Sequence, residues 1–488
     1  MEGRTARHSI EGKLTILFVR HELCYTIATY FISVQEGRES MSTIHSFPGG
    51  IHPHEGMGGK ATTSVLPIVQ APQPSRVTIP LGQHMGAPCK PLVQKGDLVK
   101  IGQIIGEPVG FMSAAVHASV SGKVLDCQQC ILANGLEQAS IIIDNDFTDE
   151  WVTLKPIEKP EEMTGQELSQ YAREMGIVGL GGATFPTAVK LAVPSDKKVD
   201  TLILNGAECE PYLSADHRQM VENASGIVSG ARVIQKALGI ERVLIGIEQN
   251  KPDAIEAMRK ACEGLENYEV IALKVKYPQG GEKQLVYALT GRKVKMGGLP
   301  LDLGVIVSNV GTCYALHRAV YEGRPIVDRV VTVGGCVAKP ANYIARIGTS
   351  VEWLLDTSGG ILPETKMLIY GGPMMGQAIS REDIPITKGC SGIVALDKLS
   401  ALAEEGPCIR CGRCLEACPM KLSPTNIDRF MRKSMFEEAE KLNAMNCLEC
   451  GACTWVCPAK RNLTQSCRVC KRIITQRRKE AAAKKGGK

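Results

Sequence analysis

This chain of 488 residues lacks the features that mark membrane-spanning and secreted proteins. No segment offers the roughly 18 consecutive apolar residues that a transmembrane helix needs. The nearest candidate, Leu14 to Val34, is interrupted by Arg20, His21 and Glu22. No small-residue cleavage site comes cleanly after that stretch, so we expect no secretory signal peptide. A membrane span and export through a signal peptide are therefore both disfavoured.

Aromatic residues are also scarce, at 5%, and none interleaves with the basic residues of the C-terminal end. The net charge of +6 comes from 57 basic and 51 acidic residues, and much of the excess lies in residues 471–488. We expect this end to be solvated and partly disordered. The alternative is weak attraction to an anionic membrane surface or an acidic partner. Without interleaved aromatic residues, nucleic-acid binding has little support.

The length predicts roughly three or four domains. An apolar fraction of 44% and a charged fraction of 22% are ordinary for a soluble globular protein. Residues 1–40 are less orderly than the sequence from Met41 onward. We therefore hypothesise that 1–40 is an upstream extension of a reading frame that starts at Met41, which the intact mass of the native protein would test.

Nineteen cysteines on a long chain without an evident secretory signal indicate a reduced, intracellular setting. Eight of them form two runs of the spacing C-x2-C-x2-C-x3-C-P, which bacterial two-cluster ferredoxins use for a pair of [4Fe–4S] centres. In that arrangement the fourth cysteine of each run binds the other cluster. We assign a first set to one cluster, namely Cys408, Cys411, Cys414 and Cys457. We assign a second set to the other, namely Cys447, Cys450, Cys453 and Cys418.

The alternative for these runs is a pair of structural zinc sites, since C-x2-C pairs also bind zinc. Zinc explains neither the third C-x2 step nor the proline after each fourth cysteine, Pro419 and Pro458. Among the remaining cysteines, the pairs Cys127–Cys130 and Cys467–Cys470 lack a companion pair at a useful spacing. The iron–sulfur interpretation makes this a protein that moves single electrons.

The segment from Arg76 to Asp146 is β-rich and punctuated by glycine, and we predict four short strands in it. They are Val77–Pro80, Leu98–Ile101, Lys123–Asp126 and Ser140–Ile143. The phrases "KGDLVKIGQIIGE" and "VHASVSGKVL" resemble the barrel-sandwich fold of biotinyl and lipoyl carriers. Those carriers present a modified lysine on the hairpin between the phrases. Here that hairpin, Val109 to Ala115, contains no lysine, which indicates a docking domain rather than a carrier.

Residues 161–324 alternate helical and strand signals, as an α/β domain with a largely parallel sheet does. Thr164 and Glu167 form a predicted capping box at the start of a helix. The predicted helices are Gly165–Met175, one from near Pro186, Arg218–Gly239, Asp253–Gly264 and Glu282–Thr290. The predicted strands are Asp200–Asn205, Arg242–Glu248, Val270–Val275 and Val305–Ser308.

The last third divides into a small module and a cluster domain. Residues 325–376 resemble a β-grasp (SLBB) module, with strands Val330–Gly334 and Met367–Gly371 and a helix Ser350–Thr357. We expect it to pack the preceding α/β domain against the cluster domain. Residues 401–470 form the helical two-cluster domain, in which Pro424–Leu442 is predicted as one helix. The predicted division is completed by an N-terminal domain over 41–150 and a basic tail over 471–488.

A glycine-rich segment, "GIVGLGGATFPTAVKL" at Gly176–Leu191, joins two predicted helices and opens the second. The free N–H groups there favour an anion such as a phosphate, and Lys190 can add a positive charge. Glycines let the main chain approach a flat ring. A second segment, "LNGAECEPYL", places Asn205, Glu208 and Glu210 at the carboxyl end of a predicted strand, where open α/β sheets bind ligands.

With "YPQGGEKQLV" at Tyr277–Val286 and "SNVGTC" at Ser308–Cys313, these segments resemble the NADH-oxidising flavoprotein subunit of respiratory complex I. Its "GRGGAGFP", "ESEP" and "NNVET" segments match Gly179–Pro186, Glu208–Pro211 and Ser308–Thr312. The resemblance implies FMN held by Gly179, Gly181, Gly182, Phe185, Lys190, Asn205 and Asn309, with Tyr277 beside it. It implies a nicotinamide-nucleotide pocket lined by Glu208, Glu210 and Glu282.

Three residues depart from that pattern: Leu180 replaces an arginine, Ala207 an acid, and Lys283 stands at a second acidic position. They lend weight to a rival interpretation, a non-catalytic electron conduit with a decayed flavin pocket. They also leave open how tightly NADH binds and how strictly NADPH is excluded.

The order of modules, with "FPGGIHPHEGMGGKATTS" and "IPLGQHMGAPCKPLVQKGDLVKIGQIIG" near the start, resembles the C subunit of the Rnf complex, an ion-translocating ferredoxin:NAD+ oxidoreductase. This resemblance implies electron transfer between NAD(H), FMN and two [4Fe–4S] clusters. It further implies partners among the other Rnf subunits, including a ferredoxin-like one, at the cytoplasmic face of the bacterial inner membrane. The alternative is a soluble reductase such as the cobalamin reductase of microcompartments, which resembles the N-terminal module less.

Overall fold

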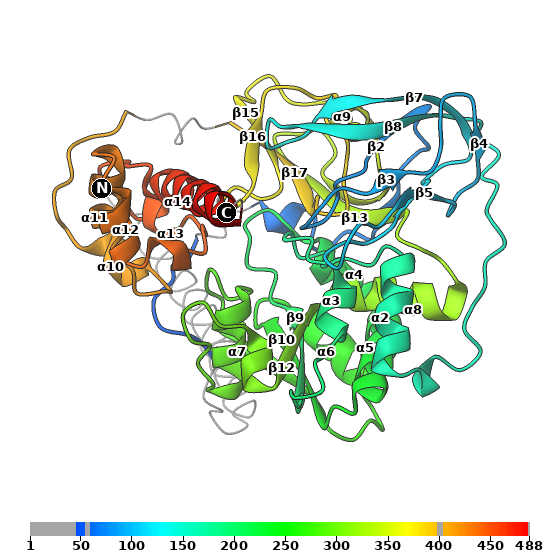
Figure 1. Cartoon of the computed structure of the whole chain (residues 1–488), viewed down its shortest axis with the longest axis horizontal. Coiled ribbons are helices and arrows are strands. Elements are labelled where there is room, and N and C mark those ends of the chain that lie inside the picture. Colours follow the sequence, from blue (N-terminus) through cyan, green and yellow to red (C-terminus); the bar gives the residue numbers. More distant parts are fainter. Residues whose placement is uncertain (1–44, 54–58, 398–403, 487–488) are drawn as a thin grey trace, which may run out of the picture. The chain divides into compact units, whose positions relative to one another are not determined.

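The computed structural model describes residues 45–53, 59–397 and 404–486, drawn in colour in Figure 1. The hypothesis on residues 1–40 and Met41 lies outside this range. Within it, no helix combines the length and the apolar character needed to cross a bilayer. Helices and strands are labelled as in Figure 1.

The N-terminal module packs two small antiparallel sheets around one apolar core. The first has the order β2-β8-β7-β4, and the second the order β3-β5-β6. Their bounds are β2 Arg76–Pro80, β3 Lys90–Pro91, β4 Leu98–Val99, β5 Ile104–Glu107, β6 Val116–His117, β7 Gly122–Ile131 and β8 Glu137–Asn145. The side chains of Ile79, Ile105 and Ile141 are fully buried between the sheets. β7 and β8 extend beyond the predicted strands because they pair with each other along most of their length.

The α/β module contains the predicted parallel sheet, in the order β11-β10-β9-β12. The strands are β9 Thr201–Gly206, β10 Arg242–Glu248, β11 Tyr268–Leu273 and β12 Val305–Asn309. The helices are α2 Gly165–Glu174, α3 Thr187–Leu191, α4 Ala215–Glu222, α5 Ala224–Leu238, α6 Pro252–Ala261, α7 Glu282–Thr290 and α8 Val310–Glu322. Short 3-10 turns are η3 Pro160–Glu162 and η4 Pro300–Leu303, and a further one, η2 Lys60–Thr62, lies outside this module, ahead of β2.

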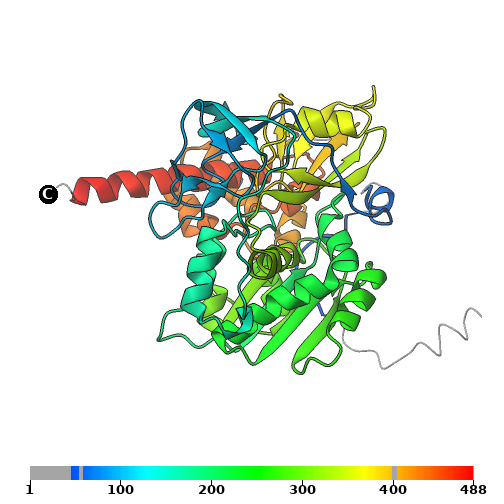
Figure 2. The same cartoon turned by 90° about the vertical axis from the view of Figure 1, so that its right-hand side faces the viewer.

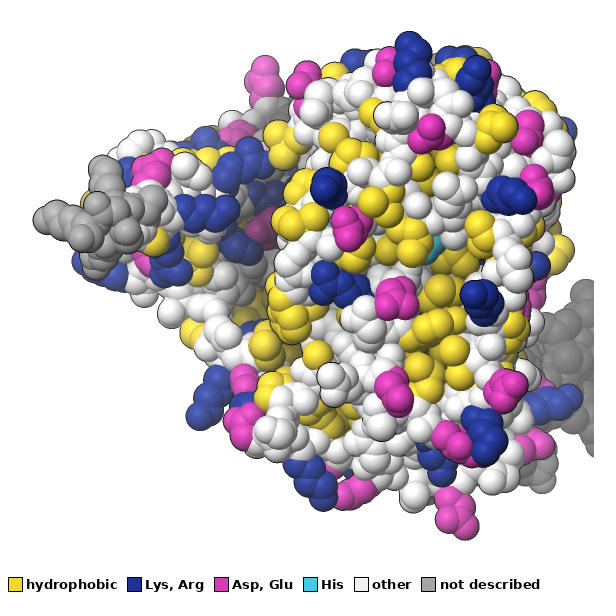
Figure 3. Space-filling view, turned by 45° about the vertical axis from the view of Figure 1, so that its right-hand side comes forward, with side chains coloured by type: hydrophobic (Ala, Val, Ile, Leu, Met, Phe, Trp, Pro, Cys, Tyr) yellow, Lys and Arg dark blue, Asp and Glu magenta, His cyan; other side chains and the backbone are white. Residues whose placement is uncertain are grey.

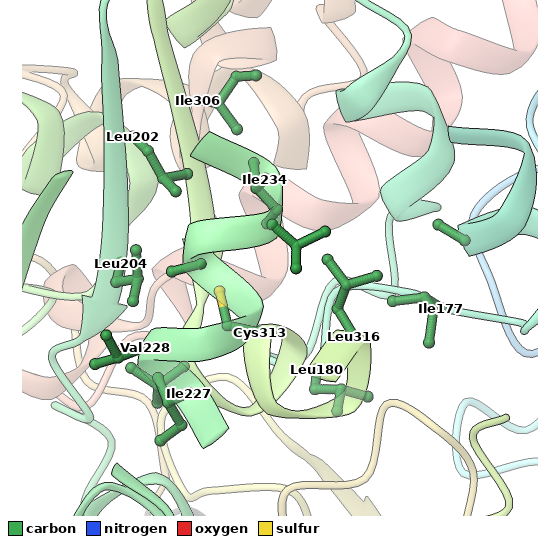
Figure 4. Close-up of a cluster of buried hydrophobic side chains, with 14 of the residues drawn as sticks. Ile177, Leu180, Leu202, Leu204, Ile227, Val228, Ile234, Ile306, Cys313 and Leu316 are labelled. Carbon is green, nitrogen blue, oxygen red and sulfur yellow. The ribbon is translucent and has the colours of Figure 1, made fainter. Parts of the chain in front are cut away.

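Helices α5 and α8 form the core with one face of this sheet (Figure 4). Leu202 and Leu204 of β9 meet Ile227 and Ile234 of α5 there, as alternation along a strand and helical periodicity require. The opposite face packs against α7. A sheet buried on both faces explains why its strands are almost continuously apolar.

The capping box of α2 is confirmed, since Thr164 Oγ1 accepts from Glu167 N and Glu167 Oε2 accepts from Thr164 N. The prediction of one helix over Arg218–Gly239 is wrong. The chain leaves helical geometry at Asn223, with φ −126° and ψ 24°, so α4 and α5 are separate helices. Asparagine is unfavourable in helix interiors because its side chain hydrogen-bonds to the backbone in non-helical conformations. The apolar periodicity continues on both sides of Asn223, so the sequence pattern did not reveal the break.

The third module is a six-stranded mixed sheet of order β1-β14-β13-β17-β15-β16. Its strands are β1 Val69–Gln70, β13 Asp328–Gly335, β14 Ala341–Arg346, β15 Met367–Tyr370, β16 Gln377–Ile379 and β17 Gly392–Leu396, with helix α9 Val351–Thr357. The predicted strands and helix of this module are all present. The edge strand β1 comes from residues ahead of β2 in the N-terminal part of the chain and pairs in parallel with β14, so that part of the chain contributes a strand to the third module.

The cluster module is helical: α10 Arg413–Ala417, α11 Pro424–Arg432, α12 Phe436–Lys441, η6 Ala444–Asn446, α13 Ala452–Trp455 and α14 Leu463–Gly486. The single helix predicted over Pro424–Leu442 is wrong. Ser434 has φ +57°, a left-handed conformation that ends α11 and lets α12 start in a new direction. This turn buries Phe436 against the other helices of the module.

The expectation of a partly disordered tail is also wrong for residues 471–486, which continue α14 (Figure 2). Lysine, arginine, glutamine, glutamate and alanine all favour helix. Arg477 pairs with Glu437 at 2.6 Å, and Arg478 pairs with Glu440, so α14 is tied to α12. In Figure 3 basic side chains outnumber acidic ones on the part of the surface at the left.

Candidate functional site

Two asparagines meet at the carboxyl edge of the parallel sheet. Asn205 lies at the end of β9 and Asn309 ends β12, and the strand register pairs them directly. Asn205 Nδ2 donates to Gly280 O at 2.9 Å, which brings the loop after Tyr277 to the same edge. The structure thus gathers three of the segments that the sequence singled out.

The glycine loop 179–186 is held next to these asparagines by Leu180. Leu180 is 8% exposed and packs into the core near Leu316, as Figure 4 shows, while its N–H donates to Thr312 Oγ1 at 2.9 Å. Gly181 faces the side chain of Asn309. Gly182 has φ +105° with open space where a Cβ would stand. A bare, open backbone beside two amides fits the approach of a flat ring.

Lys190, Phe185 and Glu282 form a charged group beside that loop. Lys190 Nζ donates to Glu282 Oε1 at 2.8 Å and to Val307 O at 2.9 Å, and lies 5.9 Å from the centre of the Phe185 ring. Helix α3 has only five residues, so its dipole is much weaker than the sequence suggested. Lys190 stays the cation that we expect to face a phosphate here.

Glu208 is buried and holds the start of α4. Its two carboxylate oxygens accept from the N–H groups of Asp216, at 3.0 Å, and His217, at 3.1 Å. Asp216 in turn accepts from Asn309 Nδ2 at 2.7 Å. Burial, and then the charge of Glu208, raises the pKa of Asp216 to about 7. The backbone carbonyl of Glu208 accepts from the ammonium group of the half-buried Lys60, whose pKa is lowered by desolvation.

Glu210 belongs to a different group from Glu208. Its Oε1 accepts from Met374 N at 2.6 Å and from Met375 N at 3.1 Å, in the turn 371–376 of the third module. Burial raises the pKa of Glu210 to about 7. Glu210 also hydrogen-bonds to Tyr277, so it lies with the third module and this tyrosine rather than with the group around Lys190.

Tyr277 joins the α/β module to the cluster module. It is 1% exposed, and its hydroxyl donates to the backbone carbonyl of Cys450 at 2.6 Å. Its own backbone pairs with Ile51 through two hydrogen bonds of 2.8 Å. Gly50 N, beside Ile51, donates to Ala417 O at 2.9 Å. Burial raises the pKa of the Tyr277 phenol well above its ordinary value, so the hydroxyl keeps its proton.

The second cysteine set surrounds a small cavity of about 20 Å³. Cys418, Cys447, Cys450 and Cys453 all line it, together with Cys467 of α14. Leu422 N donates to Cys418 Sγ and Glu449 N donates to Cys447 Sγ, both at 3.3 Å. Four convergent thiols with N–H donors to their sulfurs fit a [4Fe–4S] cluster.

The first set is more open. Cys408 and Cys411 are exposed, whereas Cys414 packs with Leu463 and Cys457. Thr425 contacts two of the four, since its hydroxyl lies 3.4 Å from Cys408 Sγ and its N–H donates to Cys414. The structure therefore brings Cys408, Cys414 and Cys457 into one region, with Cys411 on the loop that precedes α10.

Within the described residues, no three side chains of His, Cys, Asp or Glu converge on a point suited to one metal ion. A zinc ion needs thiolates about 2.3 Å from its centre, whereas a cubane holds them apart around its corners. Cys127 and Cys130 lie on β7, one exposed and one half-buried.

Sequence reasoning missed a buried charge group at the same sheet edge. Lys251 Nζ lies 2.9 Å from Glu248 Oε2, and both side chains are 2% exposed. Glu248 also accepts from Lys276 N at 3.2 Å, directly before Tyr277. The rule that placed Asn205 at the end of β9 applies equally to Glu248 at the end of β10 and could have found it.

Four family models match the chain. They are the RnfC barrel sandwich hybrid domain over residues 45–148, the Nuo51 FMN-binding domain over 172–318, the SLBB domain over 330–378 and the 4Fe-4S dicluster domain over 401–458.

Curated relatives match across the modules. The chain is 49% identical to the C subunit of the proton-translocating ferredoxin:NAD(+) oxidoreductase complex of Clostridium ljungdahlii, over 82% of this chain and 87% of the relative. It is 47% identical to the C subunit of the Na(+)-translocating ferredoxin:NAD(+) oxidoreductase complex of Acetobacterium woodii, over 89% and 98%. The chain belongs to the family of Rnf complex C subunits. This family membership disfavours the cobalamin-reductase alternative.

Among solved structures, an NAD+-reducing [NiFe]-hydrogenase in the air-oxidised state resembles part of the chain. The TM-score is 0.44 at 19% identity, covering 58% of this chain and 56% of the other. The same kind of hydrogenase in the H2-reduced state gives a TM-score of 0.46, at 19% identity over 64% and 65%. These are partial likenesses of fold.

Proposed function

We propose that this chain is the peripheral NADH-, FMN- and iron–sulfur-containing subunit of a membrane-bound, ion-translocating ferredoxin:NAD+ oxidoreductase. It passes electrons between NAD(H), FMN and two [4Fe–4S] clusters. One observation carries this proposal: the buried hydroxyl of Tyr277, in the FMN-binding fold, donates to the backbone of Cys450 in the second cysteine set.

The residues of the sheet edge fit FMN. Gly179, Gly181, Gly182 and Phe185 would border the ring, with Tyr277 on the side toward the clusters. Asn205 and Asn309 present amides at the paired strand ends, and Lys190 supplies the cation for the phosphate. Leu180 and Ala207 are buried parts of the core here, so these two departures serve packing and do not mark a decayed pocket.

Of the three glutamates, Glu282 is best placed for the nicotinamide nucleotide, since it lies with Lys190 and is half-exposed. Glu208 and Glu210 have their carboxylates engaged by backbone N–H groups. We therefore propose that Glu208 and Glu210 support the wall of the pocket and do not themselves contact the nucleotide. When bound, FMN supplies the exchange between the electron pair of a hydride and single electrons. No side-chain acid or base is needed for the hydride.

The surroundings of the cysteines assign different tasks to the two sets. Tyr277, Ile51 and the 371–376 turn enclose the second set on the side of the flavin module. The first set faces solvent at Cys408 and Cys411, next to Arg410 and Arg413. An acidic, ferredoxin-like iron–sulfur subunit fits such an exposed, basic-rimmed site.

We propose that the assembly holds this chain at the cytoplasmic face of the bacterial inner membrane, with the other Rnf subunits as partners. The relatives are named as subunits of a complex, which supports this arrangement. Ion translocation is then the task of membrane subunits. Co-purification with integral-membrane proteins would test it, and a chain isolated alone from gently solubilised membranes would contradict it.

The decisive experiment is an anaerobic NADH titration of the reconstituted full chain, followed by visible absorption and EPR. We expect bleaching of the flavin band together with signals from reduced clusters. Lys190→Met should weaken FMN retention about tenfold or more, because a charged hydrogen-bond donor is lost. Lys283→Met is the matched control, since the Lys283 ammonium donates to Lys295 O at the surface.

Two results would contradict the proposal. If iron is present but NADH reduces nothing, the chain is a conduit without a working flavin site. If Lys190→Met retains as much FMN as Lys283→Met, the flavin is not held at the carboxyl edge of the parallel sheet.

A further inference from the structure

Cys467 of α14 is a fifth thiol at the second cysteine set. It is 1% exposed and lines the same cavity as Cys418, Cys447, Cys450 and Cys453. The spacing of the two runs already provides four ligands for each cluster. Cys467 is therefore an additional sulfur beside a complete ligand set, with no task of its own in the proposed electron path.

The position of Cys467 is fixed by charged contacts on the same face of α14. Lys471, one turn further on, donates to Cys447 O at 2.8 Å and to Glu449 Oε1 at 2.6 Å. Arg468 pairs with Glu449 at 3.3 Å. These contacts hold α14 against the loop that begins with Cys447.

A second anchor holds the start of α14. Ser466, directly before Cys467, donates to the buried carboxylate of Asp428 at 2.6 Å, and Arg461 and Arg432 complete that network. With both neighbours fixed, the Cys467 thiol lines the same cavity as Cys447, and the two sulfurs are hydrogen-bonded. Its partner is one of the four sulfurs assigned to the second cluster.

We propose that Cys467 is a non-ligating, positioning thiol that donates its S–H to the Cys447 sulfur and thereby raises the reduction potential of the second cluster. The proposal rests on the proposed function, since it requires a cluster on the second set. A reduced cluster carries one more negative charge, part of which lies on the ligand sulfurs. A donor to such a sulfur stabilises the reduced state more than the oxidised one. The proton stays on Cys467, and no covalent bond changes.

The test is an EPR-monitored redox titration of the reconstituted full chain, with dithionite as the electron source. In Cys467→Ala and in Cys467→Val, which fills the space, the ratio of reduced to oxidised second cluster should fall about tenfold at a fixed potential. For a one-electron couple this is about 59 mV. Cys467→Ser keeps a donor and should stay close to the wild type. Cys470→Ala is the matched control, since Cys470 is on the same helix, 0% exposed, and outside the cavity.

Two results would overturn the proposal. The first is an unchanged potential in both Cys467→Ala and Cys467→Val. The second is loss of about half the iron in these variants but not in Cys470→Ala, which would make Cys467 a ligand. A wild type without two reducible clusters would instead refute the proposed function itself, so the two failures are distinguishable.

Discussion

Cys411 and Cys450 hold the same position in two cysteine runs of identical spacing, yet their surroundings differ. Cys411 is exposed, whereas Cys450 is 9% exposed and its carbonyl accepts from Tyr277. The glycines directly after them, Gly412 and Gly451, have nearly the same φ, +78° and +81°. Gly412 has open space around it, but a Cβ on Gly451 would stand 2.7 Å from Met374 O.

The comparison indicates that the local motif sets the geometry of the cysteine ligands, whereas segments distant in the sequence set how far solvent reaches them. The left-handed residues before the two cysteines, Arg410 and Glu449, have φ values of +56° and +58°. The two loops are thus built alike. Contacts from distant segments, among them Tyr277, Met374 and α14, make the second one an interior site.

The largest expected effect comes from removing one ligand from each set. Cys411→Ala and Cys450→Ala should each halve the iron content, from about eight to about four per chain. Because metal binding stabilises the fold around it, Cys450→Ala should also lower the thermal midpoint, since the second cluster connects three modules. Cys411→Ala should leave the midpoint close to that of the wild type. Iron analysis measures the iron content, and anaerobic thermal unfolding measures the midpoint. Equal midpoints for the two variants would contradict the claim that only the second set is enclosed by other modules.

A smaller effect is expected from the two matched glycines. Gly412→Ala should destabilise by about 1 kcal/mol, the cost of a left-handed conformation for a residue with a Cβ. Gly451→Ala should cost about 2–3 kcal/mol, because the new methyl group also meets the backbone oxygen of Met374. Denaturant unfolding under anaerobic conditions gives the two free energies of unfolding. A cost for Gly412→Ala as large as that for Gly451→Ala would mean that the first set is enclosed as well.

The last effect appears as the pH rises and comes from Glu210, which ties the second set's neighbour Tyr277 to the 371–376 turn. Its folded pKa of about 7 exceeds the ordinary value of 4.5, so the folded state binds a proton more tightly than the unfolded state. The stabilisation is complete below about pH 4.5 and is lost as the pH rises through 7. Glu210→Gln should therefore gain up to about 3 kcal/mol over the wild type at about pH 8 and less than about 1 kcal/mol at about pH 5.

Thermal midpoints of the wild type and Glu210→Gln at the two pH values measure this difference. Glu256→Gln is a suitable control, because Glu256 is an exposed residue of α6. A pH-independent gap between wild type and Glu210→Gln would show that Glu210 is already ionised in the acidic sample.

Local structure was largely predictable from the sequence where neighbours along the chain decide it. The capping box of α2, the bounds of α7 and the four parallel strands follow from periodicity and capping residues. The predictions failed where one residue departs from a continuous pattern, at Asn223 and at Ser434. The C-terminal helix was missed because its ion pairs reach Glu437 and Glu440, far away in the sequence.

Some residues of the candidate site were likewise predictable from the sequence and others were not. Asn205 and Asn309 were predictable, because parallel strands bring their carboxyl ends to one edge. Lys60 was not, since it reaches the carbonyl of Glu208 from a segment outside the α/β module. The separation of Glu208 from Glu210 was not predictable either, although they are two residues apart. Glu208 bonds to the start of α4, whereas Glu210 bonds to the 371–376 turn.

The sequence by itself determined the chemistry of this protein: eight cysteines at ferredoxin spacing and a glycine loop beside two strand-end asparagines. Both features depend only on residue types and short spacings, so they can be recognised without knowing how the rest of the chain folds. The tertiary structure alone decided which cysteine set is enclosed, which one faces solvent, and that Cys467 stands at the second set. Those outcomes come from contacts between segments far apart in the sequence, such as Tyr277 with Cys450, and no local pattern records them.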